Sequence, residues 1–168
     1  MTELLIARHG ETDWNRERRW QGHADPPLNE LGRAQARRLA DALAREGLEA
    51  IYASDLRRAY ETAEIVGARL GLPVTSDPGL REIDVGSRSG LTSDEIGDRD
   101  WDGETQEAHG ARVLASIRRI TREHPRGRVL VVAHGGSLRR VFEAIGESEG
   151  QPAAGNCELY RVAYDRLD

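Results

Sequence analysis

Two stretches of the chain share one pattern, in which a run of apolar residues ends at a histidine that glycine follows. The first run covers residues 4–7 and leads into Arg8 and His9, and the second covers 129–133 and leads into His134. Short, continuous apolar runs of this kind are typical of buried strands. Open α/β sheets bind their ligands at the carboxyl ends of such strands. If the two strands are parallel neighbours, an arginine and two histidines converge on one point.

The rest of the chain alternates between helical and strand patterns. Apolar residues recur at helical spacing in four segments, 31–43, 56–70, 113–120 and 138–145. Further strands are predicted at 49–53, 74–75 and 159–164. Asn29 is expected to cap the first helix, and Ser54-Asp55 the second. This alternation favours an α/β protein with a mostly parallel sheet and helices on both of its faces.

Two polar segments are expected near the mouth of the site. Residues 13–27 contain Gly22 and two adjacent prolines, and predict a loop that wraps around it. Residues 87–104 are rich in aspartate and glycine, and predict a short lid with at most one helical turn, after Ser93. With 168 residues, 38% of them hydrophobic, the chain is expected to form one domain over residues 1–168.

The charge balance gives no reason to expect a nucleic-acid or membrane partner. The chain has 24 basic and 29 acidic residues, a net charge of −5, and no long block of one sign. Every basic residue is arginine, which a coding bias explains without any ligand. Trp14 and Trp20 lie among arginines, as in a base-stacking patch, but acidic neighbours dilute its charge.

Cysteine and histidine usage favours a cytoplasmic protein without a metal site. The single cysteine, Cys157, cannot form an intrachain disulfide, and the apolar runs are too short for a signal peptide or a membrane span. The chain has no cysteine cluster and no H-E-x-x-H motif, so we expect no bound metal. The polar surroundings of three further histidines predict surface positions for His23, His109 and His124.

Arg57 and Arg58 open the helix predicted at 56–70. Cations in a first turn oppose the helix dipole, so a helix built only for stability would not carry two of them. An anion bound at this helix end would remove the conflict. The alternative is that one or both side chains extend into water.

Several groups of residues, spread in order over almost the whole chain, carry a family resemblance. They are Arg8-His9-Gly10-Glu11-Thr12, Trp14-Asn15, Gln21-Gly22, Ser54-Asp55-Leu56-Arg57-Arg58-Ala59 with Thr62-Ala63, Leu80-Arg81-Glu82 with Gly86, and His134-Gly135-Gly136. Together they resemble the histidine phosphatase superfamily, and more narrowly its branch of cofactor-dependent phosphoglycerate mutases and small phosphatases. The resemblance implies a phosphohistidine enzyme on a three-layer α/β/α sandwich, phosphoglycerate mutase-like in fold.

The resemblance also implies roles for individual residues. His9 would be the nucleophile, Glu82 the proton donor, and the family pattern, in which the phosphate-binding arginine directly precedes the helix alanine, selects Arg58 over Arg57. The implied catalytic set is His9, Glu82, His134, Arg8 and Arg58. The implied substrate-binding set is Arg8, Asn15, Gln21, Gly22, Arg58, His134 and Gly135.

Phosphoryl-transfer chemistry is consistent with these roles. Its transition state spreads negative charge over three oxygens, which arginine forks bind well. Two arginines and a second histidine supply positive charge, so we expect no metal and no other cofactor. His9 must attack as neutral imidazole, a form that is accessible near neutral pH. For the acid two alternatives stay open, because Glu82 could form an ion pair with an arginine instead and Asp84 could take its place.

The segment after the implied acid departs from the mutase pattern. Arg88-Ser89-Gly90 lacks the aromatic and acidic pair common in this branch, and only residues 91–102 stand where mutases carry a long basic lid. A short acidic lid is poorly suited to keeping water away from a phosphoenzyme. We therefore expect a histidine acid-type phosphatase that hydrolyses a small phosphorylated metabolite. The alternatives are mutase-type transfer and a non-catalytic phosphate-binding module. The sequence predicts neither a particular substrate nor an oligomeric state.

Overall fold

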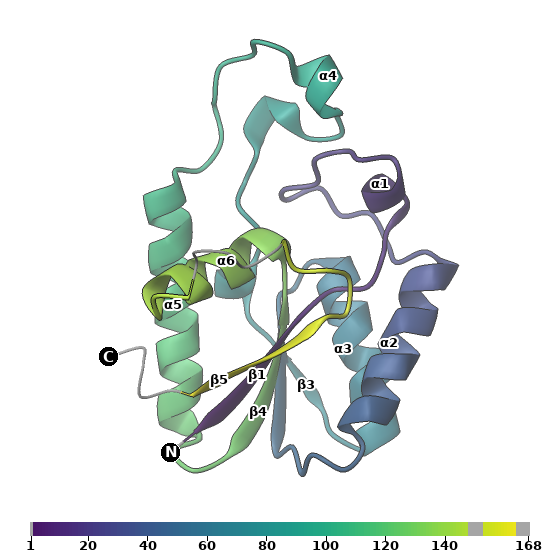
Figure 1. Ribbon diagram of the computed structural model, residues 1–168, viewed down its shortest axis with the longest axis vertical. Coiled ribbons are helices and arrows are strands. Elements are labelled where there is room, and N and C mark those ends of the chain that lie inside the picture. The colour runs from purple at the N-terminus through teal and green to yellow at the C-terminus, as the bar shows by residue number, and fades with distance from the viewer. Residues whose placement is uncertain (1, 148–152, 164–168) are drawn as a thin grey trace.

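The computed structural model describes residues 2–147 and 153–163, and a five-stranded sheet forms its centre (Figure 1). The strands are β1 (Glu3–Arg8), β2 (Ala50–Ala53), β3 (Val74–Ser76), β4 (Arg128–Ala133) and β5 (Leu159–Ala163). They stand in the order β3-β2-β4-β1-β5. All neighbouring pairs are parallel except β1 and β5, which are antiparallel. The mostly parallel sheet predicted from the sequence is confirmed.

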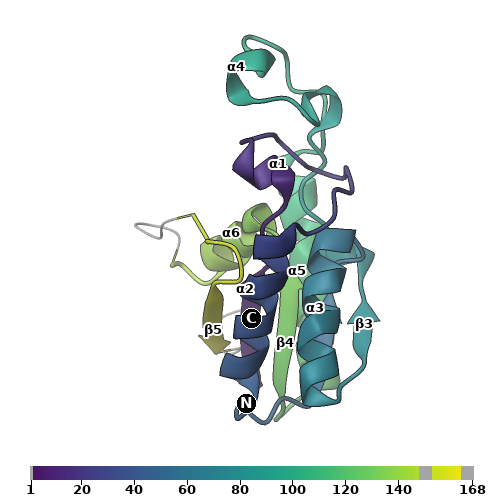
Figure 2. The ribbon, with the colours of Figure 1, turned by 90° about the vertical axis from the view of Figure 1, so that its right-hand side faces the viewer.

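Four helices cover the two faces of the sheet and complete a three-layer α/β/α sandwich (Figure 2). They are α2 (Glu30–Leu43) and α3 (Arg57–Leu70) on one face, and α5 (Gln106–Glu123) and α6 (Gly135–Ala144) on the other. Successive strand residues point to opposite faces, so Leu5 and Ala7 of β1 pack in the α2 and α3 layer, whereas Leu4 and Ile6 pack in the α5 and α6 layer. Burial on both faces explains the uninterrupted apolar runs of β1 and β4.

Short elements appear where local hydrogen bonds support them. Helix α1 (Asp13–Arg16) lies in the segment predicted as loop, because Thr12 and Asn15 form a capping box at its start. Helix α4 (Ser93–Ile96) is the single turn expected after Ser93. Two short 3₁₀ helices complete the described elements, η1 (Pro78–Leu80) and η2 (Gly86–Arg88).

Helix α3 begins differently from the prediction. Its N-cap is Leu56, and Asp55 does not cap it because both Asp55 carboxylate oxygens accept 2.7 Å hydrogen bonds from Arg81. The Ser54 hydroxyl accepts a hydrogen bond from the Leu56 N–H at 3.3 Å. The last strand was predicted to end at Tyr164, which lies outside the described residues. Residues 148–152 of the loop predicted at 146–155 also lie outside them.

The two polar segments, 13–27 and 87–104, lie beyond the carboxyl ends of the central strands, with α4 furthest from the sheet (Figure 1). The Trp20 N–H donates to the Leu91 carbonyl at 2.9 Å, and the Gly90 N–H donates to the Trp20 carbonyl at 2.8 Å. These bonds join the two segments to each other beyond the strand ends. In the described ranges, no helix has the length and apolar character needed to cross a bilayer.

Candidate active site

Strands β1 and β4 bring the two strand-histidine segments together. They are parallel neighbours with Arg8 opposite Ala133, so His9 and His134 leave the sheet side by side. The two imidazole centroids lie 5.3 Å apart, and both side chains are almost fully buried. The pairing predicted from the repeated pattern is confirmed.

The His9 ring has one defined tautomer. Its Nδ1 lies 2.7 Å from the Gly10 carbonyl oxygen, which can only accept, so Nδ1 carries the hydrogen and Nε2 keeps its lone pair. Burial, reinforced by the charges of Arg58 and Arg8, holds the His9 pKa well below its usual 6.5. His9 is therefore a neutral imidazole with an unprotonated Nε2 at neutral pH.

Three buried nitrogens around His9 lack a hydrogen-bond partner within the described part of the chain. They are Arg8 Nε, Arg58 Nε and His134 Nδ1. Buried polar atoms are nearly always satisfied in native proteins, so a group of three at one point indicates a site that receives an acceptor. An anion with several oxygens fits this set, because two of its members belong to guanidinium groups.

Backbone carbonyls hold the two arginines in place. Arg58, 1% exposed, donates from Nη1 to the Ala24 carbonyl and from Nη2 to the Gly22 carbonyl, both at 2.8 Å. Arg8 donates from Nη1 to the Ala154 carbonyl at 2.7 Å. Burial lowers the Arg58 pKa to about 10, so the guanidinium still carries its charge at neutral pH. Positive charge is thus fixed beside His9 without a carboxylate bonded to either arginine.

His134 is held from the opposite side of its ring. Its Nε2 lies 2.8 Å from the Ser54 hydroxyl, which leaves Nδ1 as the unpartnered nitrogen. Burial and the charge of Arg58 hold the His134 pKa well below its usual value. His134 is completely buried and adjoins His9, while the pocket wall itself is formed by other residues.

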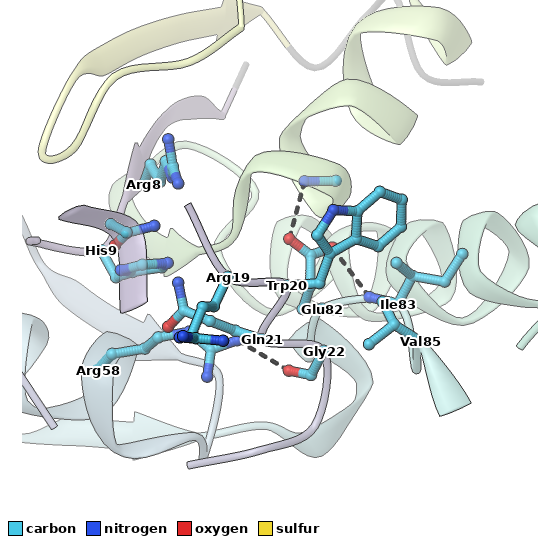
Figure 3. Close-up of a pocket in the computed structure, with 12 residues that line it drawn as sticks. Arg8, His9, Arg19, Trp20, Gln21, Gly22, Arg58, Glu82, Ile83 and Val85 are labelled. Atoms are coloured by element: carbon cyan, nitrogen blue, oxygen red, sulfur yellow. Dashed lines mark hydrogen bonds between the residues drawn. The ribbon is translucent and has the colours of Figure 1, made fainter. Parts of the chain in front are cut away.

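These groups open into a pocket of about 310 Å³ (Figure 3). Of the residues that the sequence assigned to the site, the pocket is lined by Arg8, His9, Asn15, Gln21, Gly22, Arg58 and Glu82. Gly136 also lines the pocket, whereas Gly135, which the resemblance assigned to substrate binding, does not. Gly135 lies beside Arg8, because a Cβ added to it would be 3.7 Å from Arg8 Nε. The remaining lining residues, which the sequence did not single out as site residues, are Arg19, Trp20, Ile83 and Val85.

The Glu82 carboxylate faces this pocket and is held by backbone N–H groups. One oxygen accepts from the Ile83 N–H at 2.9 Å, and the other from the Gly136 N–H at 3.0 Å. Among the described residues, no arginine forms an ion pair with Glu82. The nearby Arg81 and Arg112 pair with Asp55 and Glu104 instead. Asp84 is outside the pocket lining and accepts from the Gly86 N–H at 2.9 Å. The geometry therefore favours Glu82 over Asp84 as the carboxyl group available to a ligand.

The prediction of a surface position is wrong for His109. It is 1% exposed, because it lies four residues before Val113 on the inward stripe of α5. Its Nε2 lies 3.2 Å from the Ser137 hydroxyl and 3.9 Å from a Glu82 oxygen. His23 and His124 are half-buried rather than exposed.

Within the described ranges no cluster of three or more His, Cys, Asp or Glu side chains could hold a metal ion.

The arginine pair at the start of α3 divides between two environments. Arg58 turns into the site, whereas the Arg57 side chain is exposed, as the alternative reading of the sequence allowed. The backbone N–H of Arg57 donates to the Asp25 carboxylate at 2.7 Å. A side-chain anion of the chain itself therefore stabilises this helix end, and the sequence-based argument for a bound anion applies only to Arg58.

Protonation of the buried histidines predicts acid sensitivity. Because their pKa values are lowered in the folded state, the unfolded chain binds protons below about pH 6.5 that the folded chain does not. Well below that point, His9 and His134 together lower the unfolding free energy by about 3 kcal/mol per pH unit, because each takes up about one proton on unfolding. Urea unfolding between pH 7 and 5 in phosphate-free buffer measures this slope. We expect His134→Gln to reduce the slope by the contribution of about one proton, and a flat profile in the unaltered chain would contradict the neutral, buried state.

Comparisons with known proteins place this geometry in a family. The model of the histidine phosphatase superfamily (branch 1) matches residues 4–167. Phosphoglycerate mutase-like protein 4 of Arabidopsis thaliana is 38% identical over an alignment of 160 residues that covers 84% of this chain and 70% of the relative. The uncharacterized phosphatase PhoE of Bacillus subtilis is 32% identical over an alignment of 173 residues that covers 100% of this chain and 89% of the relative.

A solved structure extends the similarity to the whole fold. The mycobacterial glucosyl-3-phosphoglycerate phosphatase in complex with VO3 superposes with a TM-score of 0.88 at 32% identity, over 98% of this chain and 93% of that one. Members with phosphatase and mutase names are therefore both close to this chain. The match in sequence, in fold and in the order of the motifs shows that the chain belongs to branch 1 of the histidine phosphatase superfamily.

Proposed function

We propose that this chain hydrolyses phosphomonoesters through a phosphohistidine intermediate on His9, without a metal ion. The observation that carries the proposal is the set of buried, unpartnered nitrogens of Arg8, Arg58 and His134 around a neutral imidazole. Two similarities support it, the phosphatase name of the Bacillus subtilis relative and the vanadium oxyanion in the mycobacterial phosphatase structure. Such an oxyanion resembles a phosphoryl group in charge and shape.

Substrate binding follows from the free donors. Each Nη atom of Arg58 donates one hydrogen bond to a backbone carbonyl, whereas its Nε–H has no partner among the described residues and is the donor that we assign to a phosphate oxygen. Arg8 offers its Nε–H in the same way. Asn15 lines the pocket and adds a hydrogen bond from its amide. Donors fixed before the ligand arrives stabilise the transition state without reorganisation.

The first chemical step transfers the phosphoryl group to His9. Its Nε2 lone pair attacks phosphorus, a P–N bond forms, and the P–O bond to the leaving alcohol breaks. Glu82, in its protonated form, gives its proton to that oxygen. The Nδ1–H keeps its bond to the Gly10 carbonyl, which stabilises the positive charge that develops on the ring. The products are a free alcohol, a phosphohistidine and a Glu82 carboxylate.

The second step returns the enzyme to its starting state. The Glu82 carboxylate takes a proton from a water molecule, whose oxygen attacks phosphorus as the P–N bond breaks. Inorganic phosphate leaves, His9 is neutral again and Glu82 is protonated again. Arg8 and Arg58 remain bound to the phosphoryl oxygens throughout, so the protein's contribution is positioning and charge stabilisation.

Mutase-type transfer is the second candidate, since the Arabidopsis relative is named phosphoglycerate mutase-like. A mutase must exclude water from its phosphoenzyme, whereas the short segment 87–104 carries several acidic side chains and none of its residues lines the pocket. In an assay with 3-phosphoglycerate and its bisphosphate primer, we expect every phosphoryl group that leaves the enzyme to appear as inorganic phosphate. Formation of the isomer instead would establish the mutase reaction.

Hydrolysis of 4-nitrophenyl phosphate in the presence of EDTA tests the proposed function. We expect full activity with the chelator and inhibition by vanadate. Loss of activity in EDTA that a divalent cation restores would show a metal-dependent enzyme and contradict the proposal. Tight phosphate binding without any turnover would identify the non-catalytic phosphate-binding module.

Glu82→Gln tests the proton donor, because the amide fits the same space but has no acidic proton. For ethyl phosphate, whose leaving group needs a proton, we expect kcat/KM, which reports only the steps up to release of the alcohol, to fall by about 100- to 10,000-fold. For 4-nitrophenyl phosphate, whose leaving group departs as an anion, the loss should be far smaller. The control is Asp84→Asn, which should show no such dependence on the leaving group. Equal losses for both substrates in Glu82→Gln would exclude Glu82 as the acid.

A further inference from the structure

The pocket continues beyond the groups that bind phosphate and changes character there. Arg8, His9 and Arg58 lie at one end of Figure 3, and Trp20, Ile83 and Val85 lie at the other, with Glu82 between them. A volume of about 310 Å³ falls in the range of pockets that enclose organic ligands. The leaving alcohol of a bound phosphomonoester must occupy the far end, since the proton donor marks the position of the bond that breaks.

No described residue that lines the far end offers an unpaired positive charge, and Arg88, which lies over Trp20, is not part of this lining. Among the described residues that line the pocket, Arg19 is the one cation besides Arg8 and Arg58. Its guanidinium is already paired with Glu17 at 2.8 Å and with Glu95 at 2.9 Å. A carboxylate or second phosphate on the leaving group would therefore lose water without gaining a partner, at considerable cost in free energy.

The Trp20 ring is held in place as part of the pocket wall. Its backbone N–H and carbonyl are bonded to the lid residues Leu91 and Gly90, and its indole N–H donates to the Ser93 hydroxyl at 3.3 Å. The Arg88 guanidinium lies over the ring at 5.9 Å from its centroid. Although fixed in this way, Trp20 remains 37% exposed, so part of its surface is available to a ligand.

We infer that the natural substrate is a phosphomonoester whose leaving alcohol carries an uncharged ring, which lies against Trp20, Ile83 and Val85. This inference rests on the proposed hydrolysis and adds the class of substrate. An indole gives a flat apolar surface to an aromatic ring or to the C–H face of a sugar. Small acids such as phosphoglycerate lack such a ring and bring a second negative charge to an end of the pocket whose described lining offers no unpaired cation.

Four esters test the inference by their kcat/KM values, namely benzyl phosphate, glucose 6-phosphate, ethyl phosphate and 3-phosphoglycerate. All four release an alkyl alcohol, so leaving-group basicity does not separate them. We expect both ring esters to exceed ethyl phosphate and 3-phosphoglycerate by about tenfold or more. Trp20→Ala should reduce the ratio of benzyl to ethyl phosphate by about tenfold, and Trp20→Phe, which keeps a ring but not the indole N–H, should largely preserve it.

Trp101→Ala is the matched control, since Trp101 is an exposed tryptophan that also packs on Arg88, at 5.0 Å, but does not line the pocket. We expect this variant to leave the ratio unchanged. Hydrolysis of 3-phosphoglycerate or ethyl phosphate as efficient as that of the ring esters would overturn the inference and leave the proposed function intact. A ratio that Trp20→Ala does not alter would overturn it as well. Failure to hydrolyse any of the four esters would overturn both.

Discussion

His9→Ala is expected to abolish turnover of every phosphomonoester, with a loss in kcat on the order of 10,000-fold or more. The reason is that Nε2 of His9 is the one unprotonated nitrogen that the described pocket lining offers as a nucleophile, and alanine leaves only the groups that bind phosphate. Binding should survive, because Arg8 and Arg58 do not depend on the imidazole for their positions. Steady-state kinetics and phosphate binding by calorimetry measure the two effects separately.

His124→Ala is the control for this variant. His124 is bonded to Tyr52 and Glu49 on the far side of the molecule from the pocket, so its loss should leave kcat within about twofold, as expected of sites away from special features. An His9→Ala enzyme that retains a tenth or more of the activity would exclude His9 as the nucleophile.

Arg58→Lys is expected to lower kcat/KM by about 1,000-fold while the chain stays folded, the size of effect that an arginine on a transferring phosphoryl group has. Lysine keeps the charge, but its single nitrogen cannot replace a planar fork whose two Nη atoms bond the carbonyls of Ala24 and Gly22 while Nε faces the phosphate site. The measurement is kcat/KM for 4-nitrophenyl phosphate, with circular dichroism as the check on folding.

The neighbouring residue gives a matched control, because Arg57→Lys makes the same chemical change on an exposed side chain. We expect its kcat/KM to remain within about twofold of the unaltered enzyme. If the two variants lose activity equally, the buried guanidinium of Arg58 has no special role and the proposed phosphate site is wrong.

The half of the site that comes from strand ends could be predicted from the sequence. The runs before His9 and His134 have no polar interruption, which indicates strands buried on both faces, and parallel neighbours bring their ends together. The pair Arg57 and Arg58 could be flagged as well, since cations in the first turn of a helix require an explanation, but only the family resemblance selected Arg58. Pattern and spacing were therefore sufficient for the strand ends, which are local in sequence, and not for the choice between the two arginines.

The position of the acid could not be derived in this way. Glu82 lies in an irregular segment that Arg112 of α5 holds through the carbonyls of Gly79, Arg81 and Glu82, at 2.7 to 2.9 Å. Arg112 is in turn paired with Glu104, at the end of the lid segment. No periodic pattern marks contacts between a helix and a loop thirty residues earlier, so only the family resemblance singled out Glu82.

The Trp20 wall and the burial of His109 were missed for related reasons. Trp20 belongs to a polar segment whose course depends on hydrogen bonds to residues 90 and 91, far along the chain. His109 extends the apolar stripe of α5 by one turn, but it closely follows the polar residues 104–107. A helical projection that included position 109 would have placed it with Val113 on the inward face.

The most direct test of the account is to trap the covalent intermediate. The enzyme is mixed with radiolabelled substrate, quenched within milliseconds by alkaline denaturant and digested, and the labelled peptide is sequenced. The account predicts a base-stable, acid-labile phosphoryl group on His9, formed and lost at rates that agree with turnover. Label on any other residue, or turnover without any covalent label, would contradict it.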